Sequence, residues 1–166
     1  MKTIQKKNKV LSLLILLLVA FSCSSDVVYT SYTAVENNSW DTHKKITFNF
    51  SITDTISKQN VFINIRNNNA YKYSNLFLIT ELVFPNNTRV IDTLEYEMAD
   101  RRGKFLGKGF TETKENKLFY KEEKIFPISG AYSFHVRQAM RKNGRTEGVK
   151  TLEGILSVGL SIEKIK

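Results

Sequence analysis

Ile46-Thr47-Phe48-Asn49-Phe50-Ser51-Ile52 is the stretch that decides the fold of this chain. Apolar and polar side chains alternate throughout it, which is the pattern of a β-strand with one face in a core. The same signal recurs at 61–66, 75–84, 89–95, 118–126, 132–136 and 152–162. Segments rich in Asn, Pro and Gly separate these runs, and no long helical crossover is evident. The sequence therefore predicts an all-β domain over 40–166, an antiparallel β-sandwich of about seven or eight strands.

The N-terminus has the pattern of an export signal. Four lysines and no acidic residue occupy the first nine positions, and an apolar run over 10–21 follows, interrupted only by Ser12. A helix of this length rises about 18 Å at 1.5 Å per residue, which is less than the roughly 30 Å hydrocarbon core of a bilayer. Residues 1–22 are therefore interpreted as a signal peptide that is removed from the mature protein.

Cys23 is the only cysteine, and it follows Ala20-Phe21-Ser22 at the end of this signal. A lone thiol in an oxidising compartment has no disulfide partner, so it needs another explanation. Residues 20–23 resemble the lipobox of bacterial lipoproteins, although Phe21 departs from the usual small residue. We predict acyl chains such as palmitate on Cys23; the alternative is a free cysteine beside an ordinary cleavage site. Residues 23–39 are polar after the cysteine and lack periodicity, which predicts a flexible tether.

Residues with catalytic or metal-binding chemistry are scarce. The chain has two histidines, His43 and His135, and no His or Cys spacing that would complete a zinc site. No nucleophile lies beside a base in any recognisable motif. The formal charge of +9 owes part of its size to the signal lysines, so it gives no argument for nucleic acid. We predict a protein that is not an enzyme, has no metal or cofactor, and binds neither nucleic acid nor a small-molecule ligand.

A glycine-rich segment, Arg101-Arg102-Gly103-Lys104-Phe105-Leu106-Gly107-Lys108-Gly109, could suggest a phosphate cradle. Its spacing matches neither a P-loop nor a dinucleotide fingerprint, and no strand-to-helix context surrounds it. A loop or bulged strand with positive φ explains the glycines better. We hypothesise a partner contact here through Arg101, Arg102, Lys104 and Phe105.

Aromatic residues allow two interpretations. Tyr71 and Tyr73 could stack on sugars, together with Phe105, Phe119 and Tyr120. In an all-β chain, however, such rings are mostly core residues or cross-strand pairs. The single tryptophan, Trp40, is expected to plug one end of the sandwich.

Two short motifs look like an acceptor pattern for bacterial O-glycosylation of periplasmic proteins. They are Asp54-Thr55-Ile56 and Asp92-Thr93-Leu94. Three residues also match by chance, so Thr55 and Thr93 are possible modification sites on the motif alone.

Several segments, taken in order, resemble the gliding motility lipoprotein GldH family of Bacteroidota. The segments with this resemblance are 38–40, Ile63-Asn64-Ile65-Arg66-Asn67, 71–76, 92–94, 103–109, 130–132, 138–141 and 152–163. The resemblance implies a lipoprotein needed for gliding and linked to the type IX secretion machinery of the envelope. It supplies no catalytic residues, and the family also has members in non-gliding bacteria.

The leading hypothesis is a lipid-anchored, non-enzymatic accessory or scaffold that contacts other envelope motility and secretion proteins. Ser24-Ser25-Asp26 carries a single acidic residue, which favours the periplasmic face of the outer membrane over surface export. The alternative hypothesis is a surface lipoprotein that binds glycan through exposed Tyr71 and Tyr73.

Overall fold

The computed structural model describes residues 26–109 and 111–165. The predicted signal peptide and Cys23 lie outside these residues. The strands are β1 (Val27–Ala34), β2 (Ser39–Asp41), β3 (Ile46–Ile52), β4 (Gln59–Asn67), β5 (Asn75–Val83), β6 (Arg89–Glu97), β7 (Lys114–Lys124), β8 (Gly130–Gln138), β9 (Thr151–Glu153) and β10 (Ile155–Lys164). The only helical element in the described part of the chain is a 3-10 turn, η1 (Glu36–Asn38). None of the described helices is long and apolar enough to cross a membrane.

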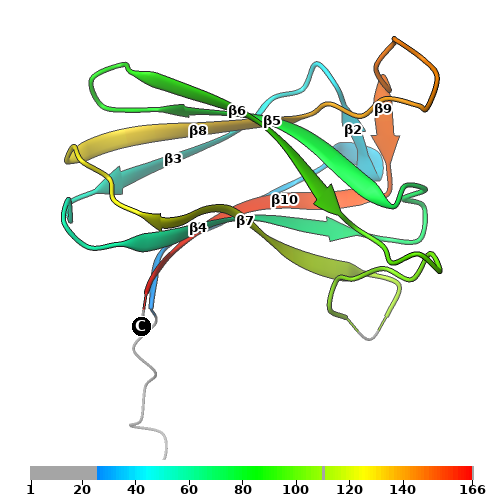
Figure 1. The fold of residues 1–166 in the computed structure, drawn as a ribbon, viewed down its shortest axis with the longest axis horizontal. Coiled ribbons are helices and arrows are strands. Elements are labelled where there is room, and N and C mark those ends of the chain that lie inside the picture. The colour runs from blue at the N-terminus through cyan, green and yellow to red at the C-terminus, as the bar shows by residue number, and fades with distance from the viewer. Residues whose placement is uncertain (1–25, 110, 166) are drawn as a thin grey trace, which may run out of the picture.

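Two four-stranded sheets form the layers of a sandwich (Figure 1). One has the order β1-β10-β4-β7, and the other has the order β3-β8-β5-β6. All their pairings are antiparallel, and β2 and β9 form a small separate ribbon. The predicted all-β sandwich is confirmed, with more strands than expected. The extra strands are β1 and β2. In addition, the predicted strand over 152–162 is divided at Gly154 into β9 and β10.

The tether predicted over 23–39 is wrong for the part that the structure describes. Val27–Ala34 forms β1, which pairs with β10 from Val27 opposite Glu163 to Ala34 opposite Ser157. The domain therefore starts at Val27 and not at Trp40. Because β1 lies at the edge of its sheet and most of its side chains are exposed, it needs no alternating pattern of apolar residues.

The core follows the pattern of the stretch that predicted the fold. Ile46, Phe48, Phe50 and Ile52 of β3 are buried, and the polar residues between them are exposed. The Phe50 ring stacks on Tyr132 of β8 with centroids 5.6 Å apart. Burying each such side chain contributes about 1.5–3 kcal/mol to the free energy of folding, so the buried side chains between the sheets hold the sandwich together.

Trp40 closes one end of the sandwich, as expected. Its side chain is 1% exposed, and its Nε1 donates a hydrogen bond to the Lys44 carbonyl oxygen at 2.9 Å. The β2–β9 ribbon that carries it lies at the same end as the β4–β5, β6–β7 and β8–β9 connections (Figure 1). The chain enters and leaves at the opposite end, where the Lys164 amide donates to the Asp26 carbonyl oxygen at 2.8 Å.

Gly154 between β9 and β10 offers a test of this packing. Its φ is +82°, and an added Cβ would lie 2.1 Å from the backbone nitrogen of Tyr71. Gly144 has a similar φ of +75° but nothing within 4 Å of its Cβ position. We expect Gly144→Ala to cost about 1 kcal/mol of backbone strain, and Gly154→Ala to cost about 3 kcal/mol or more.

Urea unfolding followed by the fluorescence of the single tryptophan measures both free energies. Equal costs for the two variants would contradict the close approach of the β9–β10 turn to Tyr71.

Candidate functional site

Three connections come together at the end of the sandwich opposite the termini. They are the β4–β5 loop (68–74), the β6–β7 loop (98–113) and the β8–β9 loop (139–150). The amides of Met98 and Ala99 donate to the Ser74 carbonyl oxygen at 2.7 and 3.1 Å, which joins the first two loops. Lys72 and Lys142 line one hollow of about 270 Å³, which joins the first loop to the third. We call the surface of these three loops the basic end.

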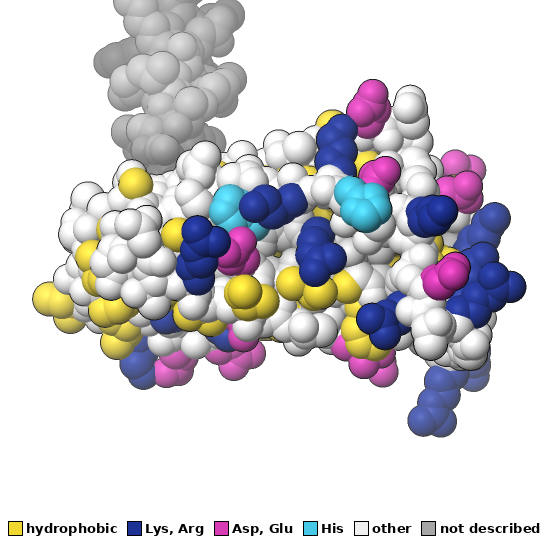
Figure 2. All heavy atoms as spheres, turned by 90° about the horizontal axis from the view of Figure 1, so that it is seen from above, with side chains coloured by type: hydrophobic (Ala, Val, Ile, Leu, Met, Phe, Trp, Pro, Cys, Tyr) yellow, Lys and Arg dark blue, Asp and Glu magenta, His cyan; other side chains and the backbone are white. Residues whose placement is uncertain are grey.

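The basic end has a large excess of positive charge. It carries nine lysines and arginines and three acidic residues. The basic residues are Lys72, Arg101, Arg102, Lys104, Lys108, Arg141, Lys142, Arg145 and Lys150, and the acidic residues are Asp100, Glu112 and Glu147. Within the described chain, only Lys72 of this set forms an ion pair, with Glu153 at 3.8 Å. Figure 2 shows Lys and Arg side chains gathered at the right-hand end of the molecule. The other eight cations are therefore available to an acidic partner.

The glycine-rich segment forms a tight turn that presents three of these cations. The Asp100 carboxylate accepts hydrogen bonds from the amides of Arg102 and Lys104, both at 2.9 Å. Gly103 has a φ of +80°, as predicted for a glycine in this loop. Arg101, Arg102 and Lys104 are exposed around the turn. The structure thus places three of the four proposed contact residues on the surface.

Phe105, the fourth proposed contact residue, points toward the core. It is partly buried, and its ring lies 6.4 Å from that of Tyr71. Its position holds the turn against the sandwich and does not present the ring to a partner.

The β8–β9 loop is a part of this end that the sequence did not assign to a site. Arg141, Lys142, Arg145 and Lys150 are all exposed on it. Their density along the chain was visible in the sequence. What was missing was the topology that brings 141–150 to the same end as 101–104.

The glycan alternative required Tyr71 and Tyr73 to be exposed, and this expectation is wrong. Tyr71 is 2% exposed, and its hydroxyl donates to the Asn75 carbonyl oxygen at 2.6 Å. Burial raises the pKa of Tyr71 far above its ordinary value. Tyr73 packs edge-on against it with centroids 5.8 Å apart. These two rings stabilise the β4–β5 loop and do not form a platform for a sugar.

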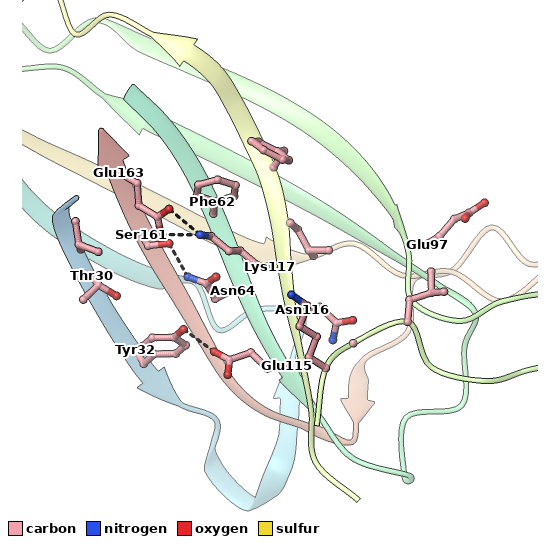
Figure 3. A pocket seen from close by; sticks show the side chains of 16 residues that line it. Thr30, Tyr32, Phe62, Asn64, Glu97, Glu115, Asn116, Lys117, Ser161 and Glu163 are labelled. Atoms are coloured by element: carbon pink, nitrogen blue, oxygen red, sulfur yellow. Dashed lines mark hydrogen bonds and ion pairs between the residues drawn. The ribbon is translucent and has the colours of Figure 1, made fainter. Parts of the chain in front are cut away.

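A broad hollow of about 810 Å³ lies along the β1-β10-β4-β7 sheet (Figure 3). Polar side chains on its floor pair with one another across the strands. The Tyr32 hydroxyl donates to Glu115 at 2.8 Å, and Lys117 contacts both carboxylate oxygens of Glu163 at 2.7 Å. Burial and the Glu115 carboxylate raise the pKa of Tyr32 to about 12. Because these groups satisfy one another, we interpret them as cross-strand ties of the sheet.

The histidines have surface or structural surroundings. His135 lies on the outer side of β8 with its Nδ1 2.9 Å from the Thr47 hydroxyl. Burial and the nearby Lys45 lower its pKa. His43 is exposed, and its amide donates to the Asp41 carboxylate. Among the described residues, no group of three or more His, Cys, Asp or Glu side chains could hold a metal ion.

The two candidate acceptor threonines differ in accessibility. Thr93 is exposed on β6, an edge strand of its sheet. Thr55 is partly buried in the β3–β4 loop. Hydrogen bonds from Ser57 and from the Ile56 amide to Asp54 stabilise this loop and lower the pKa of Asp54 to about 2.

Comparisons with known proteins agree with the resemblance seen in the sequence. The chain is 47% identical over 143 residues to the gliding motility lipoprotein GldH homolog of Christiangramia forsetii, covering 86% of this chain and 87% of that protein. It is 41% identical over 152 residues to gliding motility lipoprotein GldH of Flavobacterium johnsoniae, covering 92% of this chain and 94% of that protein.

A solved structure of the infectious bursal disease virus VP2 subviral particle is also similar, at a TM-score of 0.35 and 15% identity. The similarity covers 81% of this chain and 30% of that chain. The family model described as GldH lipoprotein matches residues 27–162, from the first residue of β1 into β10. The chain belongs to the GldH lipoprotein family.

Proposed function

We propose that this protein is a membrane-anchored, non-enzymatic component of the gliding motility and type IX secretion machinery, in which it acts as an accessory or scaffold. The names of two relatives, which refer to gliding motility, support the first part of this role. The family description, a lipoprotein, supports a protein held at a membrane of the cell envelope.

The proposed anchor is lipid on Cys23, at the periplasmic face of the outer membrane. Two or more acyl chains on one residue hold a protein stably on a bilayer, at about 0.8 kcal/mol per buried methylene. The single acidic residue in Ser24-Ser25-Asp26 supports the periplasmic face.

The proposed mode of action is contact through the basic end with an acidic surface on another envelope protein. The observation that carries this proposal is the convergence of three loops with nine basic and three acidic residues at one end. Complementary charge increases the rate and specificity of association more than its affinity. Confinement to a membrane raises the effective concentration of both partners, so a small contact suffices.

Removing charge from the tight turn tests the contact. We expect a strain that carries Arg101→Ala, Arg102→Ala and Lys104→Ala to lose colony spreading and protein secretion, because the turn no longer attracts its partner. The variant should keep its fold, since exposed side chains without structural contacts usually change the unfolding free energy by less than about 0.5 kcal/mol.

A matched control removes three positive charges from the opposite end of the sandwich, with Lys58→Ala, Arg89→Ala and Lys164→Ala. These side chains are exposed, and they lie in the β3–β4 loop, at the start of β6 and at the end of β10. The control strain should spread and secrete normally. Normal spreading of the loop variant, or equal loss in both strains, would contradict a specific contact at the basic end.

We also propose glycosylation within the Asp-Thr motifs, with Thr93 favoured over Thr55 because it is more exposed. The intact mass of the protein purified from its host should exceed the mass of polypeptide plus lipid. Thr93→Ala should remove most of this excess, and Thr88→Ala, an exposed threonine outside the motifs, should leave it unchanged. A mass equal to polypeptide plus lipid in the unmodified sequence would end the proposal.

A further inference from the structure

Exposed aliphatic side chains gather at the end of the sandwich where the chain enters and leaves. Ile56 at the tip of the β3–β4 loop is 84% exposed, which is extreme for an isoleucine in a folded domain. Ile125 in the β7–β8 loop is 42% exposed, and Val28 and Ile165 near the two termini are each 39% exposed. Hydrophobic side chains are also visible at the left-hand end of the molecule in Figure 2.

Contacts between their segments show that these residues belong to one surface. Val28, Asp54 and Lys164 line a common hollow of about 300 Å³, which places the β3–β4 loop beside both termini. Lys58 of the same loop forms an ion pair with Glu123, next to the β7–β8 loop. We call the surface around Ile56, Ile125, Val28 and Ile165 the apolar end.

The length of chain before the domain determines which end can reach a membrane. Only Ser24 and Ser25 lie between Cys23 and Asp26, and a fully extended chain spans at most about 3.6 Å per residue, so these three steps span about 11 Å in total. β1 then runs for 8 residues toward the basic end, a distance of about 26 Å at 3.3 Å per residue. A lipid on Cys23 therefore holds the apolar end against the bilayer and leaves the basic end farther away.

We propose that the apolar end docks on the lipid surface, with Ile56, Val28, Ile125 and Ile165 entering the interface. This inference rests on the lipidation of Cys23 in the proposed function. Charge at this end is balanced, because Lys58 pairs with Glu123 and Lys164 lies near Asp54. Docking is therefore driven by apolar burial and not by attraction to anionic lipid. The basic end points away from the bilayer, toward a partner.

Fluorescence quenching in vesicles tests this orientation. The full-length lipidated protein with Ile56→Cys carries one free thiol, because its own cysteine is acylated, and this thiol is labelled with bimane. Leu106→Cys, at a 54% exposed position in the β6–β7 loop, is the matched probe at the basic end. Vesicles contain phosphatidylethanolamine with or without phosphatidylglycerol, plus lipid that bears a doxyl quencher in its acyl chain.

We expect several-fold stronger quenching at position 56 than at position 106, with or without phosphatidylglycerol. Equal quenching at both positions, or stronger quenching at 106 that requires phosphatidylglycerol, would overturn the docking. If the lipidated protein binds the vesicles but position 56 is not quenched, the anchor stands and the docking is wrong. If the lipidated protein binds no better than a Cys23→Ala form, the anchor itself is refuted, and the docking with it.

Discussion

The pairing of the first strand with the last is the constraint on which the rest of the structure depends. β1 closes the edge of its sheet against β10, with Tyr32 opposite Gly159. Because Gly159 has no side chain, the Tyr32 ring lies across its backbone, where an added Cβ would be 2.6 Å from the ring. The Tyr32 hydroxyl then reaches Glu115 on β7, and the Arg66 guanidinium lies 4.6 Å from the ring centroid. One side chain thus ties together all four strands of the sheet.

The same pairing gives the molecule two unlike ends. Asp26 and Lys164, near the two ends of the described chain, lie together at the apolar end, and the strands between them carry the basic loops to the opposite end (Figure 1). A sandwich with a continuous core is a rigid spacer, so the separation between anchor and basic end is fixed by strand length. A protein of this shape needs no catalytic centre to act, because it can hold a contact surface at a set distance from a membrane. The polar side chains in the broad hollow also stiffen this spacer, because they pair with one another across the strands of the β1-β10-β4-β7 sheet.

Strands with one buried face could be predicted from the sequence, because alternation is a local signal. β3 is the clearest case, with matching predicted and observed bounds. β1 could not be recognised in this way, since its mostly exposed edge position removes the alternation that marks a strand. Its valines and tyrosines were the remaining signal, and they were outweighed by the polar residues around them.

The candidate site was predicted in part for a similar reason. Glycine at positive φ and exposed arginine are local properties, so the turn at 101–104 was recognised as a presenting loop. The direction of an aromatic ring and the meeting of distant loops depend on tertiary packing. Phe105 and Tyr71 therefore proved to be packing residues, and the contribution of 141–150 appeared only with the strand order.

The most direct test of the central claim, an anchored component of the motility and secretion machinery, is genetic. The gene is deleted in its host and complemented with the wild-type or the Cys23→Ala protein, and colony spreading and the secreted proteins are measured together. We predict that the deletion abolishes both and that only the form with Cys23 restores them. Normal spreading and secretion in the deletion strain would contradict the account.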